Sequence, residues 1–275
     1  MAAPFPPRFT RTVDLYGAAR FACLRRGGAI VIGLGGVGAH CVVALARSGI
    51  GRLKLMDDDR ISVSSLNRHP LAAPEDVGRL KTEILAAWIA RVCSDTEVEG
   101  VAARVDAASL AELVPPAERE LFPVLIDCID GVEAKAALLV HGARHGWRVL
   151  SSMGAAGKRD GGLVRCGDLF DSRVCPLARA VRQRVRRLGV GPGQIEAVWS
   201  VETPVPPIQE PIAANPAAAA AAAAGPAASR RQPSNAMLPG IFGFALAARA
   251  VELLTAAASP SQQRDEASRP GPDQD

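Results

Sequence analysis

The 275-residue sequence is poor in aromatic residues, at 4% of the chain, and contains no closely spaced pair of cysteines. Its six cysteines are scattered, and the absence of a CxxC pair argues against a structural zinc site and against the disulfide framework of a small secreted protein. The apolar stretch nearest in length to a membrane helix, 236–254, is interrupted by Pro239, Arg249 and Glu252. The N-terminus lacks the apolar core of a signal peptide. These absences predict a cytoplasmic protein with no membrane partner.

The remaining composition is ordinary for a globular protein. Hydrophobic residues make up 48% of the chain and charged residues 22%, which provides a core for one large domain or two small ones. The net charge is +4 and the arginines are clustered, so an anionic partner is compatible with the composition.

The segment 29–59, with the sequence AIVIGLGGVGAHCVVALARSGIGRLKLMDDD, is the most informative part of the chain. An apolar run at 29–32 predicts a strand, helical spacing at 37–46 predicts a helix, and a second strand is expected at 53–56, before three aspartates. Strand, glycine turn, helix, strand and acid form the dinucleotide-binding fingerprint in its expected structural context. The sequence therefore predicts nucleotide binding.

Each glycine of the turn has an expected role. Gly33 allows the tight turn, Gly35 lets the backbone approach a phosphate, and Gly38 lets the helix pack closely on the strand. Gly36, next to Gly35, is assigned to the same nucleotide-binding turn. The N–H groups at the start of the helix are then available to an anion. Asp57 follows at the spacing of a ribose-binding acid. The alternative is a glycine turn that serves packing alone.

The rest of the chain alternates between helical and strand-like patterns. Helical spacing recurs at 15–24, 78–91, 109–114, 132–142 and 177–188, and strand-like runs occur at 97–105, 124–130 and 149–152. The segment 163–169 is expected to add an antiparallel extension. This order predicts an α/β fold with a Rossmann-like, mostly parallel sheet flanked by helices.

Composition divides the chain into four parts. The predicted nucleotide-binding domain covers 8–203, and a low-complexity loop rich in proline and alanine follows at 204–235. Apolar helical spacing resumes at 236–254, which is expected to pack back on the domain. The polar segment 255–275 is expected to be a disordered tail.

Charged residues beyond the first two strands narrow the chemistry. Arg68 lies in the loop after the second strand, and Lys81 begins the next predicted helix. Asp127 and Asp130 end a later strand, at the sheet edge where open α/β folds bind ligands. Hydride transfer needs no such cations, whereas attack on the α-phosphate of ATP does, because negative charge grows on the phosphoryl oxygens and on the departing pyrophosphate.

We therefore assign catalytic roles to Arg68 and Lys81 at the phosphates and to Asp130 as the ligand of Mg²⁺. The alternatives are that both cations are plain surface charges and that Asp127 caps the following helix.

These motifs resemble the adenylating enzymes related to ubiquitin activators and to the thiamin and molybdopterin-synthase adenylyltransferases. The matching segments are 33–38, 57–59, 67–68, 77–81 and 127–130. Within that superfamily the chain resembles the tRNA threonylcarbamoyladenosine dehydratase family, on segments 8–11, 15–17, 135–138, 154–157, 168–169, 176–179 and 242–244. The resemblance spans 8–201, with 238–254 in addition.

The resemblance implies an ATP-dependent ring closure beside the anticodon of tRNA. Asp57 would bind ribose, with Asp59 beside it, Arg68 and Lys81 would bind the phosphates, and Asp130 would hold Mg²⁺. Arg11 matches a position that in relatives reaches across a homodimer into the neighbouring nucleotide site. The resemblance also allows a sulfur-transfer partner.

The chain departs from this family pattern at three positions. Ser65 stands in place of a usual asparagine, His69 in place of a common glutamine, and Cys175 in place of a usual acid. The segment before Phe242 is also short and interrupted by an alanine run. These departures bear on whether the site is fully active.

A basic helix connects the predicted enzyme to RNA. Arg179, Arg182 and Arg186 fall on one helical face, and lines of guanidinium groups suit a phosphate backbone. The alternative is a solvated arginine-rich face.

Two other functions remain open from the sequence. An enzyme that adenylates a ubiquitin-like or sulfur-carrier protein would use a cysteine after the core, and Cys175 is the candidate. A nucleotide-sensing scaffold would keep the fold without turnover.

Overall fold

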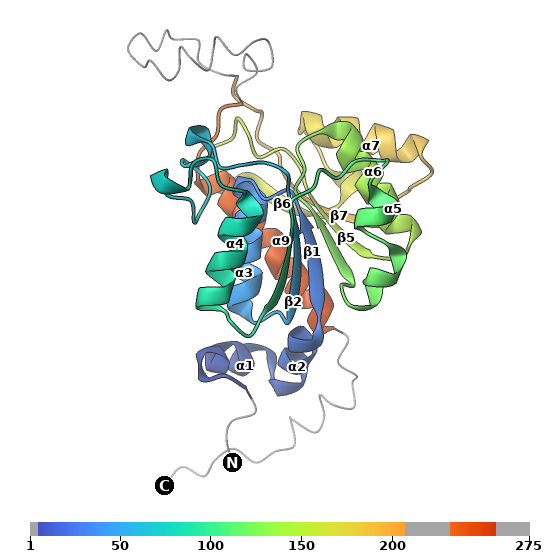
Figure 1. Cartoon of the computed structure of the whole chain (residues 1–275). Coiled ribbons are helices and arrows are strands. Elements are labelled where there is room, and N and C mark those ends of the chain that lie inside the picture. The colour runs from blue at the N-terminus through green and yellow to red at the C-terminus, as the bar shows by residue number, and fades with distance from the viewer. Residues whose placement is uncertain (1–4, 207–231, 257–275) are drawn as a thin grey trace.

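The computed structural model describes residues 5–206 and 232–256, which form an α/β fold around a seven-stranded sheet (Figure 1). In sheet order the strands are β3 (Glu97–Val101), β2 (Arg52–Met56), β1 (Gly28–Ile32), β4 (Val124–Asp127), β5 (Arg148–Ser152), β7 (Ile195–Ser200) and β6 (Val164–Asp168). All neighbours are parallel except β7 and β6, which are antiparallel. The predicted fold, including its antiparallel extension, is confirmed. Most of the predicted 204–235 loop and nearly all of the predicted tail lie outside the described residues.

Helices cover both faces of the sheet because the strands are apolar on both faces. In β1, Ala29 and Val31 belong to one buried cluster, and Ile30 and Ile32 belong to the other. This alternation is expected of a parallel strand buried on both sides. The first cluster is covered by α3 (Gly36–Ser48), α4 (Lys81–Val92) and α9 (Met237–Thr255), and the second by α5 (Leu110–Leu113), α6 (Val132–Arg144) and α7 (Pro176–Arg187).

Two helices precede β1 where the sequence pattern predicted one over 15–24. Gly17 has a φ of 81°, which glycine adopts without strain, and it ends the first helix there. The single predicted helix is therefore wrong, because a glycine turn interrupts its apolar spacing. The two helices are α1 (Thr10–Tyr16) and α2 (Ala18–Arg26).

Helices α1 and α2 lie beyond the amino-terminal ends of the strands, at the bottom of Figure 1. The rings of Phe9 and Phe21 are buried there, with centroids 5.3 Å apart. Arg25 donates hydrogen bonds to three backbone carbonyls of the sheet's lower loops, those of Gly49, Ile50 and Asp95. These contacts fix the N-terminal segment at the end of the sheet opposite the glycine turn.

The sequence pattern did not predict β7, and it predicted a longer β3. Glu196 interrupts the apolar pattern of β7, so the pattern did not indicate a strand. In the folded chain its carboxylate lies 2.7 Å from the Arg249 guanidinium of α9. Strand β3 ends at Val101 and does not reach residue 105. Short 3₁₀ turns connect the elements at Pro7–Phe9, Val63–Ser65, Pro74–Asp76, Pro116–Glu120, Gly161–Leu163 and Leu169–Asp171.

Helix α9 packs against α3 and the sheet. By length and composition it is apolar enough to cross a membrane, contrary to the expectation from its proline and charges. However, 56% of its 18-residue apolar stretch is buried inside the protein. Leu238, Phe242 and Leu246 all lie in the first core cluster. The core contacts of α9 account for its apolar composition.

A buried ion pair closes the carboxyl end of β4. Lys135 of α6 places its Nζ 2.5 Å from Oδ2 of Asp127, and both side chains are fully buried. Asp127 also accepts hydrogen bonds from Ser151 Oγ at 2.5 Å and from the Ile129 N–H at 3.0 Å. Asp127 therefore does not cap α6, whose N-cap is Gly131. The pair fixes the loop that faces the glycine turn.

We expect Lys135→Met to lower the free energy of unfolding by about 3–5 kcal/mol, because it leaves the Asp127 carboxylate buried without a countercharge. The double variant Lys135→Met/Asp127→Leu should recover part of that loss, since no charge remains to desolvate. Urea unfolding of the three proteins measures the difference. Equal stability of the single variant and the wild type would contradict this role of the pair.

Candidate nucleotide-binding site

The glycine turn lies at the carboxyl end of β1, between the ends of β2 and β4. Ile32 stands in register with Met56 on one side and with Asp127 on the other. The chain order reverses at this point in the sheet, and open α/β sheets bind ligands at such a switch point.

Gly33 and Gly38 are required by the fold itself. Gly33 has a φ of 87°, and a Cβ there would lie 2.7 Å from the carbonyl of Cys128. A Cβ on Gly38 would lie 1.9 Å from the carbonyl oxygen of Gly33. The first and third glycines therefore let the turn, helix α3 and the β4 loop approach one another.

In contrast, no contact inside the protein requires a glycine at position 35. It has an ordinary φ of −72°, and a Cβ there would meet nothing within 4 Å. It is the N-cap of α3, and no side chain caps that helix. Unpaired N–H groups facing open space favour an anion. At Gly36 space is also limited by the protein itself, since a Cβ there would lie 3.0 Å from Cβ of Pro239 and 3.1 Å from Cγ of Arg68.

Asp57 connects the second strand to the glycine turn. Its Oδ2 accepts the Leu34 N–H at 2.6 Å, and its Oδ1 accepts the Asp59 N–H at 2.7 Å. The Nζ of Lys81 lies 3.3 Å from both oxygens. The structure thus brings the predicted ribose acid and phosphate lysine together beside the turn.

Lys81 is buried although it begins a helix. Its N–H donates to the Asp59 carbonyl, an isolated bridge pairs Arg60 with Leu80, and its Nζ lies 2.6 Å from Oδ2 of Asp59. The carboxylate oxygens of Asp57, Asp58 and Asp59 lie within 4.8 Å of one another. Because the Lys81 ammonium already offsets this charge, a metal cation would compete with it there.

Arg68 approaches the turn from the loop after β2. Its Nη1 donates to the Ser64 carbonyl at 2.6 Å and to Asn67 Oδ1 at 3.0 Å. Ser65 stabilises the same loop, since its hydroxyl accepts the Ser62 N–H and its carbonyl accepts the N–H groups of Arg68 and His69. Ser65 thus positions the arginine through the backbone.

The acids after β4 differ in accessibility. Asp127 is buried in its ion pair with Lys135 and is not accessible to a ligand. Asp130, three residues further on, is exposed at the same edge of the sheet as the glycine turn. Among the described residues Asp130 has no hydrogen-bond or ion-pair partner. A single accessible carboxylate fits Mg²⁺, which usually takes one or two carboxylates together with substrate phosphates.

Arg11 is exposed on α1, beyond the amino-terminal ends of the strands. The glycine turn lies beyond their carboxyl ends (Figure 1). The structure therefore separates Arg11 from the nucleotide site of its own chain.

The predicted basic helix forms as α7, but its arginines have different environments. Arg182 donates to the carbonyl and hydroxyl of Ser172, so it supports the preceding loop. Arg186 is exposed and stacks over the ring of Phe170 at 5.2 Å. Arg179 is exposed, and Arg184 pairs with Glu133 at 2.8 Å.

Cys175, the candidate thiol, is the N-cap of α7 and only 2% exposed. Lys158, also buried, contacts it, and burial lowers the pKa of this lysine. A thiol in this position cannot meet the end of a protein partner without movement of the surrounding chain.

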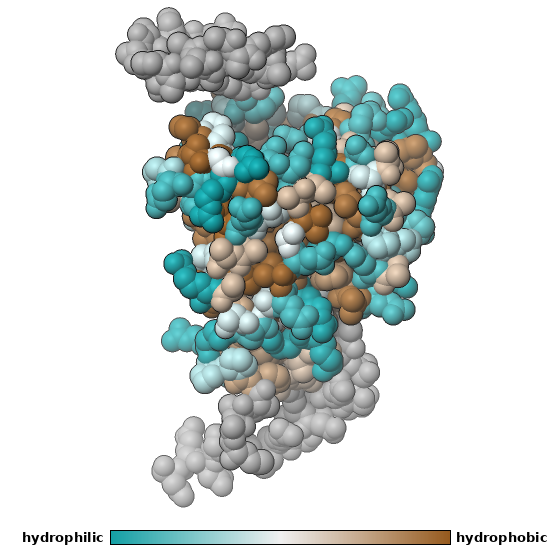
Figure 2. Space-filling model, in the orientation of Figure 1, coloured by the Kyte–Doolittle hydropathy of each residue, from teal (hydrophilic) through white to brown (hydrophobic). Residues whose placement is uncertain are grey.

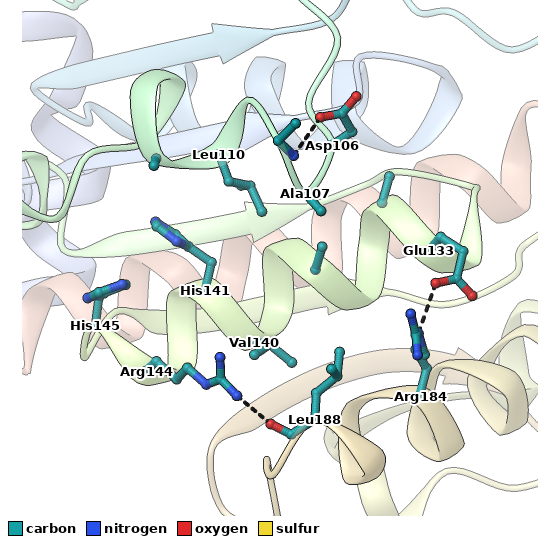
Figure 3. Close-up of a pocket in the computed structure, with 14 residues that line it drawn as sticks. Asp106, Ala107, Leu110, Glu133, Val140, His141, Arg144, His145, Arg184 and Leu188 are labelled. Atoms are coloured by element: carbon teal, nitrogen blue, oxygen red, sulfur yellow. Dashed lines mark hydrogen bonds and ion pairs between the residues drawn. The ribbon is translucent and has the colours of Figure 1, made fainter.

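A cavity of about 640 Å³ lies away from the glycine turn, between α5, α6 and α7 (Figure 3). Its floor is apolar, with Leu110, Val140 and Leu188, and the pair of Arg184 with Glu133 lies at its rim. No residue of the predicted nucleotide site lines it. His141 and His145 also lie here, with ring centroids 4.7 Å apart.

His69 is a site residue whose role the sequence did not reveal. It follows Arg68 and is 5% exposed. Burial, together with the nearby Lys81 and His40, lowers its pKa to about 4. The only sequence signal was its departure from the family's glutamine.

Comparisons with known proteins identify relatives of the chain. The ThiF family model matches residues 9–267. Over 177 residues the chain is 36% identical to tRNA threonylcarbamoyladenosine dehydratase 2 of Saccharomyces cerevisiae, which covers 64% of this chain but only 39% of that protein. It is 32% identical over 206 residues to tRNA threonylcarbamoyladenosine dehydratase of Escherichia coli, covering 73% of this chain and 75% of that protein.

Solved structures give the same picture. The crystal structure of the E. coli tRNA N6-threonylcarbamoyladenosine dehydratase in complex with ATP superposes with a TM-score of 0.78 at 28% identity. The match covers 93% of this chain and 96% of that chain.

The buried His69 predicts a pH-dependent stability. Its folded pKa of about 4 lies below the ordinary value of 6.5, so the unfolded chain binds the proton first as pH falls. The free energy of unfolding therefore has its full value above pH 6.5, where the ring is neutral in both states. It falls by about 3 kcal/mol in total as the pH is lowered from 6.5 to 4. Urea unfolding across this range should show a shallower slope for His69→Gln than for wild type, with exposed His145→Gln as the control. Equal slopes for His69→Gln and wild type would refute the assignment.

Proposed function

The chain belongs to the ThiF family, and we propose that it closes the ring of N6-threonylcarbamoyladenosine in tRNA at the expense of ATP. The observation that carries this proposal is the convergence of Arg68, Lys81 and Asp57 on the glycine turn at the β1–β4 switch point. The dehydratases that the chain resembles, one of them solved with ATP, support it.

The proposed reaction has two steps. A carboxylate oxygen of the threonylcarbamoyl group attacks the α-phosphorus of ATP, a new P–O bond forms, and the bond to pyrophosphate breaks. A second group of the same side chain then attacks the activated carbonyl carbon, and AMP departs with the former carboxylate oxygen. Because the second nucleophile belongs to the substrate, the protein supplies position and charge and needs no nucleophile of its own.

The positive side chains stabilise the charge that this reaction develops. In this proposal Arg68 and Lys81 bind the phosphates through their side chains, and the backbone N–H groups of Gly35 and Gly36, at the start of α3, donate hydrogen bonds to them. Lys81 reaches a phosphate by exchanging its contacts with the carboxylates of Asp57 and Asp59. Asp57 is then released to accept a hydroxyl of the ribose.

The exposed Asp130 would hold Mg²⁺, which supplies charge neutralisation at the phosphates when bound. The fit rests on its accessibility at the carboxyl end of the sheet and on the pairing of Asp127 elsewhere. The other aspartates of the site already have Lys81 beside them.

We propose that the tRNA backbone runs over α7. Arg179 and Arg186 are exposed and suit phosphate contacts, whereas Arg182 acts by holding the preceding loop. The anticodon loop would then place its modified adenosine near the glycine turn.

A homodimer is the proposed assembly, because Arg11 lies too far from its own site to serve it. Apolar residues are exposed around the nucleotide site. Figure 2 shows apolar atoms gathered over the loop between β2 and α4, where Val63 and Val77 are exposed, and Met237 and Phe244 are exposed on α9. Such patches favour protein contacts. In the dimer, Arg11 of one protomer would reach the phosphates of the other.

The proposed domain organisation follows the sequence boundaries. Residues 8–203 form the adenylating domain, and the helix at 236–254 completes its core, because α9 packs on α3.

Gly35→Ala tests nucleotide binding at the turn. Its added methyl group meets no protein atom, so the fold should remain intact, while the methyl group occupies the approach of a phosphate. We expect ATP affinity to fall about tenfold or more, the equivalent of at least one lost hydrogen bond. Gly191→Ala, equally open but in the loop after α7, is the control. Calorimetric titration showing normal ATP affinity for Gly35→Ala would exclude phosphate binding there.

Cys175→Ser separates ring closure from adenylation of a carrier protein. A buried thiol that takes no part in the chemistry should be replaceable, so ring closure on modified tRNA, followed by mass spectrometry, should stay near the wild-type rate. A carrier-activating enzyme needs the thiolate, and serine is a far poorer nucleophile at neutral pH. An inactive serine variant together with a trapped thioester on the wild-type protein would favour the carrier-activating function.

A further inference from the structure

The imidazole of His69 has one satisfied nitrogen and one unsatisfied nitrogen. The Nδ1 accepts the backbone N–H groups of Ala72 at 3.1 Å and of Leu71 at 3.4 Å. An atom that accepts two N–H groups carries no hydrogen, so the proton of the neutral ring is on Nε2. That Nε2 is buried and has no hydrogen-bond partner among the described residues.

An unpaired donor in this position needs an explanation, since buried polar groups nearly always have a partner. Its surroundings indicate which partner is missing. Arg68 precedes His69, and Lys81 and His40 lie close enough to disfavour a charge on the ring. His40 donates from Nδ1 to the carbonyl of Gly36 at 2.6 Å, so these groups surround the glycine turn.

We propose that His69 is a nucleotide-binding residue, whose Nε2–H donates a hydrogen bond to a phosphoryl oxygen of ATP. This inference rests on the proposed function and adds a neutral donor to its two cations. A metal cation is excluded as the partner, because the nitrogen carries a hydrogen and its neighbours are positive.

The surroundings also determine how the ring acts. Lys81, Arg68 and His40 oppose protonation, whereas Asp76 alone favours it. The ring therefore remains neutral through the physiological range and acts as a donor, not as a general base. The Nδ1 contacts fix both the tautomer and the orientation of the ring.

Nitrogen-15 NMR of the histidine rings in the full chain tests the proposal directly. The free protein should show His69 as the Nε2–H tautomer. Adding the non-hydrolysable β,γ-imido analogue of ATP should move the Hε2 resonance downfield and slow its exchange with water, while His141 and His145 stay unchanged. An unchanged Hε2 resonance at saturating analogue would overturn the proposal, including the case where a buried water is the partner.

Two variants provide a second test. His69→Gln keeps a donor and an acceptor, and its affinity for the analogue should stay within a few-fold of wild type. His69→Leu keeps neither, and its affinity should fall about tenfold. His141→Leu, which alters a half-buried histidine far from the turn, is the control. Wild-type affinity in folded His69→Leu would contradict the proposal, whereas a wild-type protein that binds no analogue would refute the proposed function itself.

Discussion

The close approach of three backbone segments at the carboxyl end of β1 is the constraint on which the rest of the site depends. The turn at Gly33, the first turn of α3 at Gly38 and the loop at Cys128 are nearer to one another than any side chain would allow. Because the backbones meet, the start of α3 is held at the gap between β1 and β4. The open space at Gly35 and the helix N–H groups are consequences of that packing. The proposed anion site thus depends on the same backbone contacts that shape this edge of the sheet.

Among the described residues, the buried charged side chains beside this turn have a countercharge, whereas one buried imidazole nitrogen there has no partner. Lys135 neutralises Asp127 below the turn, and Lys81 neutralises Asp57 and Asp59 beside it. The first pair is fully buried and serves the fold. The second pair borders solvent through Asp59, and we propose that its contacts are exchanged for those of the nucleotide. The nitrogen without a partner is Nε2 of His69, which lies among the cations of the site.

The sequence predicted the parts of the fold that depend on local patterns. The glycine spacing predicted a strand at 29–32, a turn and a helix at 37–46, which form as β1 and the slightly longer α3. Gly49, with a φ of 95°, ends that helix. Strand β7 was missed, because Glu196 interrupts its apolar pattern and finds its partner, Arg249, only in the folded chain. The sequence also could not show that Asp127 pairs with Lys135, that Arg182 bonds to Ser172 or that Cys175 is buried, because these depend on tertiary contacts and not on residue spacing. His69 was visible only as an unusual residue, since its missing partner is a property of the folded site.

Ring closure on tRNA is the proposed reaction that gives the residues around the glycine turn their roles. The most direct measurement is the release of AMP from ATP by the purified full-length protein, with tRNA that carries threonylcarbamoyladenosine and with the same tRNA lacking that modification. We expect AMP release that depends on the modified nucleoside, with mass spectrometry showing one water lost from that nucleoside. AMP release that is independent of modified tRNA, or no AMP release by a protein that binds ATP, would contradict ring closure as the reaction.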